Sequence, residues 1–278
     1  MHISDIHYSG LKDSSRLEKL YNIIKNYKTN YICITGDLID SNNVVESDIN
    51  SKYLIEWIKK LSKLSVILIS LGNHDIFLRN RHKLVKYYNK DFWNRIRSIN
   101  NVYVLDNEVY SDKNIYVYGF TLSYEYYYKY KKESVKLLLD EINKNRVNEI
   151  NENKLKICMM HSPLRLSEKS VKEKFNCYDL ILTGHMHNGV VPPIIDEIFD
   201  NDIGIISPGK KLFPKMARGI IIDNNILSIS AGMIKFHVTV TPLIRWANII
   251  YPIPINIINV TNKKCDTKKS HRYVKQNY

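Results

Sequence analysis

Cysteine is scarce in this sequence, and the spacing of its four copies excludes two kinds of cysteine-built site. None of them belongs to a Cys-x-x-Cys pair, and they lie far apart at Cys33, Cys158, Cys177 and Cys265. A structural zinc knuckle and a disulfide framework both need closer or paired spacing. We therefore expect a protein of a reducing compartment.

Long apolar runs are also missing. No stretch approaches the roughly 18 to 20 uncharged apolar residues that span a bilayer, and residues 1–9 lack the order of a signal peptide. As given, the chain is therefore expected to be soluble and cytoplasmic. Only four residues precede Asp5, which would make the first strand shorter than is usual. We therefore also expect the natural reading frame to extend upstream, which would make the protein membrane-associated.

Acidic residues are few relative to basic ones. The 41 Lys and Arg residues against 28 Asp and Glu give a formal net charge of +13. Such an excess attracts anionic partners: a phosphorylated small molecule, a lipid head group at a membrane surface, or nucleic acid, which we do not favour. Part of the excess is local, because residues 263–278 hold six Lys and Arg against one acid. We expect them to form a mobile basic tail after a single domain over residues 1–262, and the sequence indicates no protein partner.

Apolar runs of strand length alternate with patterns of helical period, which is typical of an α/β fold. A capping box at residues 15–18 is predicted to begin the first helix. Helices are predicted at 14–28, around 49–61, at 81–97, and through Leu137, Leu138, Ile142 and Val147. Strands are predicted at 1–4, 31–35, 66–71, 102–105, 115–120, 155–160, 179–183 and 203–206, with a β-rich end over 219–260 that turns at Asn224 and Asn225.

Polar clusters follow five of these strands. They are Asp5-Ile6-His7, Gly36-Asp37-Leu38-Ile39-Asp40, Gly72-Asn73-His74-Asp75, His161 and Gly184-His185-Met186-His187-Asn188. Because the carboxyl ends of parallel strands share one rim of a sheet, we expect the clusters to converge. Imidazoles and carboxylates together suit divalent manganese, iron or zinc, and their number exceeds the needs of one ion. We therefore expect two ions, bridged by one carboxylate and by a hydroxide nucleophile.

The ordered series DxH, GDxxD, GNHD, H and GHxH resembles the calcineurin-like metallophosphoesterase superfamily. The resemblance implies a four-layer α/β/β/α sandwich with two mixed central sheets. It also implies metal-dependent hydrolysis of a phosphomonoester or phosphodiester. The implied ligands are Asp5, His7 and His187 for the first ion, Asn73, His161 and His185 for the second, and Asp37 for both.

The same resemblance implies that His74 is free of metal and lies near the phosphate. There it donates to a non-bridging oxygen or protonates the leaving group, with Asp75 orienting its ring. Asp40 would hold a ligand or a loop, and a purely structural role stays open for Asp40 and Asp75. The remaining histidines are expected to be surface or core residues: His2, His82, His237 and His271.

Several interpretations stay open at this point. Residues 124–130, with five tyrosines, form either an aromatic lip that contacts a base, a sugar or a lipid, or ordinary packing, which we favour. Residues 210–218 either place cations near a substrate phosphate or form a plain charged loop; they resemble a stretch of bacterial superfamily members linked to the envelope or membrane. The alternative functions are a nuclease acting on DNA or RNA, and a metal-bound binding module without turnover.

Overall fold

The computed structural model describes most of the chain. The described residues are 1–80, 83–86, 88–123, 127, 140, 153–163, 166, 169–191, 202–208, 212–222, 225–233, 253, 255–260 and 273–277.

The first sheet has six strands in the order β14-β13-β1-β2-β3-β6. Four of them run parallel: β1 (His2–Ile3), β2 (Tyr31–Thr35), β3 (Val66–Ser70) and β6 (Val102–Leu105). The other two, β13 (Ile255–Asn259) and β14 (Tyr273–Asn277), pair antiparallel. The parallel strands β2 and β3 are nearly continuous apolar runs because both of their faces are covered.

The second sheet also has six strands, in the order β11-β12-β10-β9-β8-β7. Its parallel centre contains β8 (Ile115–Phe120), β9 (Leu155–Met160), β10 (Leu180–Thr183) and β12 (Ile226–Ile229). The edge strands β7 (Glu108–Ser111) and β11 (Gly219–Ile222) are antiparallel to their neighbours. Both sheets are therefore mixed.

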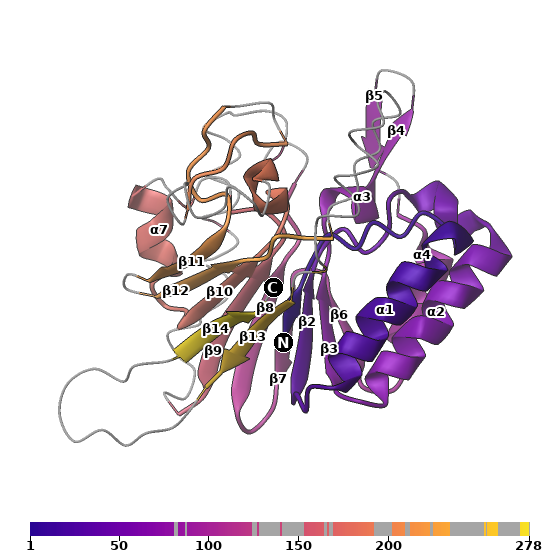
Figure 1. The fold of residues 1–278 in the computed structure, drawn as a ribbon, viewed down its shortest axis with the longest axis horizontal. Helices are drawn as coiled ribbons and strands as arrows, with labels where there is room; N and C mark the ends of the chain where they lie inside the picture. The colour runs from indigo at the N-terminus through magenta and orange to yellow at the C-terminus, as the bar shows by residue number, and fades with distance from the viewer. Residues whose placement is uncertain are drawn as a thin grey trace.

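The two sheets face each other between helical layers (Figure 1). Helices α1 (Ser14–Lys25), α2 (Asp48–Ser62) and α4 (Lys90–Arg97) cover the first sheet, and α7 (Lys169–Phe175) lies against the second. Buried side chains from both sheets, including Leu68 and Val117, form one cluster between them. Removing such apolar area from water stabilises the fold. The expected four-layer sandwich with two mixed central sheets is confirmed.

The helix predicted at 81–97 is wrong in its first half. An antiparallel hairpin of β4 (Phe77–Asn80) and β5 (Lys83–Lys86) occupies that region, and α4 begins at Lys90. The side chain of Asn89 fixes this start, because it accepts a hydrogen bond from the N–H of Phe92 at 3.0 Å.

The strand predicted at 203–206 is also wrong. Only an isolated bridge between Ile206 and Leu212 forms there. The N–H groups of Ile205 and Ile206 donate to the carbonyl of Gly189 at 2.8 and 3.0 Å, so they are not available for pairing in a sheet.

The first helix begins differently from the predicted capping box. Asp13 occupies the N-cap position, and its carboxylate accepts from the N–H and the hydroxyl of Ser9, both at 2.7 Å. The helix ends at Lys25, because the N–H groups of Asn26 and Tyr27 donate to the carbonyls three residues earlier, those of Ile23 and Ile24, and so form turns.

Of the elements predicted in the later part of the chain, some are present and others lie outside the described residues. The predicted hairpin is present as the antiparallel pair β11–β12, although Asn224 lies outside the described residues, as does the helix predicted through Leu137. Within the expected basic tail, Tyr273–Asn277 form the edge strand β14, which pairs antiparallel with β13. In the described part of the chain no helix is both long and apolar enough to cross a membrane.

Candidate metal centre

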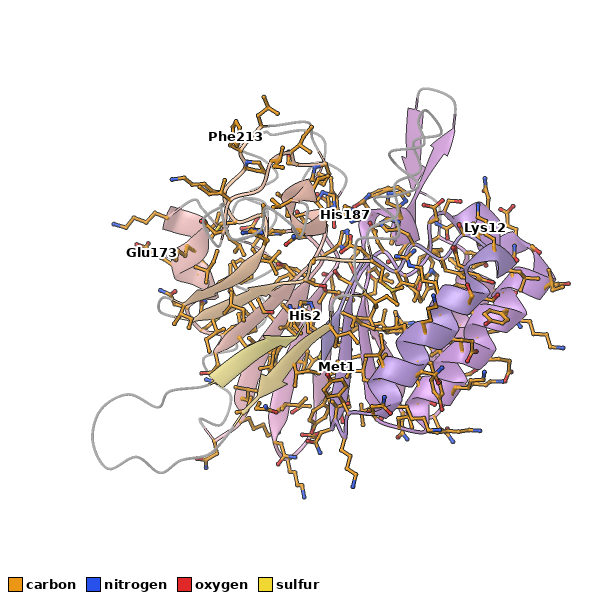
Figure 2. All side chains as sticks on the ribbon, viewed as in Figure 1. Met1, His2, Lys12, Glu173, His187 and Phe213 are labelled. Carbon is orange, nitrogen blue, oxygen red and sulfur yellow. The ribbon has the colours of Figure 1, made fainter. Side chains whose placement is uncertain are left out.

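The predicted site residues follow strands of both sheets. Asp5 and His7 follow β1, and Asp37 follows β2. From the second sheet, His161 comes directly after β9, and His185 follows β10. His187 begins the short helix η4 (His187–Val190), which lies above the junction of the sheets in Figure 2. Side chains as far as 182 positions apart are thus brought to one rim, as Asp5 and His187 show.

One ligand group contains Asp5, His7 and His187, whose candidate ligand atoms all lie within 4.8 Å of one another. Oδ1 of Asp5 lies 3.9 Å from Nε2 of His7 and 3.7 Å from Nε2 of His187. The two imidazoles stack with ring centroids 5.3 Å apart. These are the three residues that the family resemblance implied for the first ion.

A second group contains Asp37, His161 and His185 within the same limit. Nε2 of His161 lies 3.0 Å from Oδ2 of Asp37 and 3.2 Å from Nδ1 of His185. Oδ2 of Asp37 also lies 3.6 Å from Nε2 of His7, which belongs to the first group. Asp37 therefore lies between the two groups, within reach of both.

The ring orientations fit metal coordination. Nδ1 of His161 contacts the carbonyl of Thr35 at 2.8 Å, and because a carbonyl only accepts, that nitrogen carries the proton. Nε2 is thereby turned toward Oδ2 of Asp37, the position from which a histidine that donates through its other nitrogen would bind an ion. Among the described residues, the buried Nε2 of His7 has no hydrogen-bond partner. A nitrogen and oxygen donor set of this kind suits manganese, iron or zinc.

The electrostatics of the site favour a positive charge beside Asp37. Burial opposes ionisation of Asp37, but His161 and His74 outweigh it and hold the pKa of this carboxyl well below its usual value. Burial likewise opposes protonation of His161, whereas the charges of Asp37 and Asp5 raise its pKa to about 10. A divalent ion supplies the positive charge that these carboxylates attract.

Two other histidines are held neutral, which is the form that binds metal. Burial and the neighbouring charge of His161 hold the pKa of His185 well below its usual value. Burial also lowers the pKa of His187, to about 4, against the opposing charge of Asp5.

The backbone at the site adopts an uncommon conformation. Five of the expected ligand residues have a positive φ: Asp5 (50°), His7 (47°), Asp37 (51°), His185 (68°) and His187 (48°). Non-glycine residues seldom adopt this region, and such residues concentrate at functional sites. Gly72 leaves room for the packing, because a Cβ there would lie 2.2 Å from Oδ1 of Asp37.

His74 lies at the edge of both groups, and the residue that orients its ring is not Asp75, as was expected. Its backbone N–H donates to Oδ1 of Asp37 at 2.8 Å, and its Nδ1 lies 2.5 Å from the carbonyl of Asp40. The ring is therefore oriented by the backbone of Asp40, whereas the carboxylate of Asp75 accepts from Gly72 N–H at 2.8 Å and Ile39 N–H at 3.2 Å.

Asp40 and Asn73 lie beside these residues. The carboxylate of Asp40 points to the first group, with its Oδ1 3.6 Å from Nδ1 of His7. Asp40 also forms a third cluster with His7 and His74. Asn73 is buried at the first residue of α3 (Asn73–Ile76), directly before His74, on the same rim as Asp37.

Three residues to which the sequence analysis gave no role beside the ligands support them. Thr35 anchors His161 through its carbonyl. The hydroxyl of Ser4 donates to Oδ2 of Asp5 at 2.5 Å. Tyr127, hidden within the tyrosine run, is buried against the rings of His161 and His185. Backbone carbonyls and hydroxyls carry no spacing pattern, so the sequence offered nothing by which Thr35 and Ser4 could be found.

The other highlighted residues have plainer positions. His2 is a core residue, with Nε2 2.9 Å from the hydroxyl of Thr35 and Nδ1 3.3 Å from that of Ser228. Within 210–218, Lys215 is exposed and Arg218 buried. Some of the residues highlighted in the sequence analysis lie outside the described part of the chain: His82, His237, His271, Lys210, Lys211 and the tyrosines of 124–130 other than Tyr127.

The fold and the site define a class of protein: an α/β sandwich with a candidate metal centre where its two sheets meet. A family model described as calcineurin-like phosphoesterase matches residues 1–189, and the chain belongs to this family. The family expected from the motif series is thereby confirmed.

The chain is also similar to individual proteins. An uncharacterized metallophosphoesterase of Aquifex aeolicus (strain VF5) is 27% identical over 230 residues, which cover 79% of this chain and 76% of that protein. Uncharacterized protein R555 of Acanthamoeba polyphaga mimivirus is 25% identical over 207 residues, covering 67% of this chain but only 14% of the mimivirus protein. Among solved structures, a phosphopantetheinyl hydrolase of Mycobacterium tuberculosis matches with a TM-score of 0.42 and 14% identity, over 69% of this chain and 82% of that one.

Proposed function

We propose that this protein hydrolyses phosphomonoesters or phosphodiesters with the help of two divalent metal ions. Family membership supports a phosphoesterase. The observation that carries the proposal further is the pair of ligand groups on either side of Asp37, whose Oδ2 lies 3.0 Å from His161 Nε2 and 3.6 Å from His7 Nε2.

Each group would hold one ion. Asp5, His7 and His187 would bind the first, His161, His185 and Asn73 the second, and Asp37 both. Manganese, iron or zinc at these positions would polarise a phosphoryl oxygen and supply a water of low pKa as the nucleophile. The ring of His187 is about a quarter exposed, at 26%, so this side of the centre is open to solvent and to a substrate.

His74 is the proposed proton donor. With Nδ1 held by the carbonyl of Asp40, its Nε2 is the nitrogen left to meet the substrate. In its protonated form, the ring would hydrogen-bond a phosphoryl oxygen or give its proton to the departing oxygen. The hydrogen bond from its N–H to Asp37 keeps the donor at a fixed place relative to the proposed bridge.

The substrate we propose is a phosphorylated small molecule or lipid head group, in keeping with the net charge of +13. The test uses purified full-length protein with added manganese and two chromogenic esters, bis(p-nitrophenyl) phosphate and p-nitrophenyl phosphate. A panel of nucleotides, lipid head groups, DNA and RNA is run beside them. We expect hydrolysis of at least one small ester that a chelator abolishes and manganese restores.

Two outcomes would overturn this proposal. Cleavage restricted to DNA or RNA would overturn the proposed substrate class and identify a nuclease. Stable binding of metal without turnover of any ester would identify a binding module.

A further inference from the structure

Tyr127 is buried beside the two histidines of the second ligand group. Its exposed fraction is 6%. The centroid of its ring lies 5.2 Å from that of His185 and 6.1 Å from that of His161, with interplanar angles of 59° and 50°. These separations and tilts are typical of favourable aromatic packing. The described member of the tyrosine run therefore contacts the candidate metal centre from the inside, not as an exposed lip.

The topology explains why these three rings meet. Strands β8, β9 and β10 are adjacent and parallel in the second sheet. Tyr127 follows the carboxyl end of β8, His161 that of β9, and His185 that of β10. Parallel strands present these ends at one rim, so a ring placed after β8 comes to lie against the ligands that follow its neighbours.

The other histidines of the centre have supports that do not involve Tyr127. His161 is anchored by the carbonyl of Thr35, and His7 and His187 stack on each other. For His185, in contrast, neither a backbone carbonyl nor a carboxylate accepts a hydrogen bond from the ring within the described part of the chain. Its Nδ1 lies within hydrogen-bond distance of His161 Nε2, at 3.2 Å, and its ring packs on those of His161 and Tyr127.

We infer that Tyr127 is a positioning residue that holds the imidazoles of His185 and His161 in the orientation that binds the second ion. The inference rests on the proposed dinuclear function. A ligand whose ring is already fixed loses less freedom when the ion binds. Removing the residues that hold metal ligands in place through hydrogen bonds typically changes metal affinity 10- to 100-fold, and we expect an effect at the lower end of this range for ring packing. Because the contact is made by the face and edge of the ring, phenylalanine can replace tyrosine in this role.

The experiment compares metal affinity in four full-length proteins. They are the wild type, Tyr127→Ala, Tyr127→Phe and the control Tyr178→Ala. Tyr178 is also buried, at 1% exposure, but in the described structure it packs on Phe175 and Phe120 rather than on a histidine. Calorimetric titration with manganese gives the affinity of each ion, and electron paramagnetic resonance reports whether two ions are coupled.

We expect Tyr127→Ala to bind the second ion about 10-fold or more weakly while it keeps the first. Tyr127→Phe and Tyr178→Ala should stay within about threefold of the wild type. If Tyr127→Ala does not fold, as judged by circular dichroism, Tyr127→Leu takes its place, because it keeps apolar volume without the ring. The NMR signals of the His185 ring in metal-free protein should also shift in Tyr127→Leu and stay nearly unchanged in Tyr127→Phe.

The results separate this inference from the proposed function. Two ions in the wild type, with unchanged affinity in Tyr127→Ala, would overturn the positioning role and leave the dinuclear centre standing. An equal loss in Tyr178→Ala would also overturn it, because the effect would then be general to buried tyrosines. A wild type that binds fewer than two ions would overturn both.

Discussion

The backbone N–H of His74 donates a hydrogen bond to Oδ1 of Asp37 at 2.8 Å, while Oδ2 of the same carboxylate lies 3.0 Å from Nε2 of His161. One oxygen of Asp37 thus faces the second ligand group, and the other holds the segment that carries the proposed proton donor. This arrangement links metal binding to the placement of His74, and it makes the roles of these residues separable by substitution.

Asp37→Asn should abolish activity and lower the bound metal. The change removes the negative charge between the two ligand groups while it keeps the shape of the side chain, so attraction for two cations is lost. Elemental analysis and turnover are measured on the same sample. Asp91→Asn, an exposed position in the first turn of α4, makes the same charge change away from the site and should leave both values near those of the wild type. Full metal content and turnover in Asp37→Asn would remove this residue from the centre.

His74→Ala should separate chemistry from metal binding. We expect turnover to fall about 10²-fold or more, the usual scale for a proton donor or charge stabiliser, with metal content nearly intact. His185→Ala is the matched comparison and should lose metal, because this residue lies in a ligand group. Equal depletion of metal in the two variants would show that our division of roles is wrong.

Asp75→Ala should destabilise the protein. Its buried carboxylate accepts hydrogen bonds from the N–H groups of Gly72 and Ile39, and both lose their acceptor in the alanine variant. We expect the free energy of unfolding to fall by about 3 kcal/mol, since a buried donor left unsatisfied costs about 1–3 kcal/mol. Denaturant titration measures the loss, and Asp75→Asn, which keeps one acceptor oxygen, should lose less. If Asp75→Ala were as stable as the wild type and impaired only in turnover, Asp75 would be part of the chemistry, as the family resemblance implied.

Stability should depend on pH through His2. Burial, with the nearby charge of the chain's amino terminus, lowers the pKa of His2 from 6.5 to about 3 in the folded protein. Between these two pH values the unfolded chain binds a proton at His2 and the folded chain does not. The contribution of His2 to the free energy of unfolding is therefore fully present above about pH 6.5 and is lost as the pH falls toward 3. The slope from this one group approaches about 1.4 kcal/mol per pH unit.

The measurement compares wild type with His2→Gln in metal-free protein. Urea titrations between pH 4 and 6 should give a shallower loss of stability in the variant, because glutamine keeps polar contacts to Thr35 and Ser228 but does not titrate. Identical pH slopes in the two proteins would show that His2 is not held neutral in the fold.

The sequence predicted much of the fold because the parallel strands are nearly uninterrupted apolar runs. Strands such as Tyr31–Thr35 and Val66–Ser70 could be placed to within a residue. The hairpin of Phe77–Asn80 and Lys83–Lys86 could not, because its Leu and Val residues also fit a helical period, and cross-strand pairing decided between the two. The strand predicted at 203–206 was wrong for a related reason: the N–H groups of Ile205 and Ile206 donate to the carbonyl of Gly189, a contact that no local pattern of residues indicates.

The sequence predicted which residues gather at the candidate site, but not which residues hold them in place. Polar residues after strand ends identified Asp5, Asp37 and His185 without any coordinates. The partner of the His74 ring could not be found in this way, because the contact is made by the backbone carbonyl of Asp40 and not by a side chain with a recognisable spacing. The position of Tyr127 depends on the order of β8, β9 and β10 in the sheet, which a linear pattern does not contain.

The positive φ angles of the candidate ligands have an evolutionary consequence. At Asp5, His7, Asp37, His185 and His187 the chain keeps a backbone conformation that glycine adopts at lower cost. Substitutions that destroy the centre would therefore relax the backbone at these positions. In a descendant that is no longer selected for hydrolysis, glycine substitutions at the ligand positions would increase the stability of the fold. The sandwich would then be retained after the activity is lost.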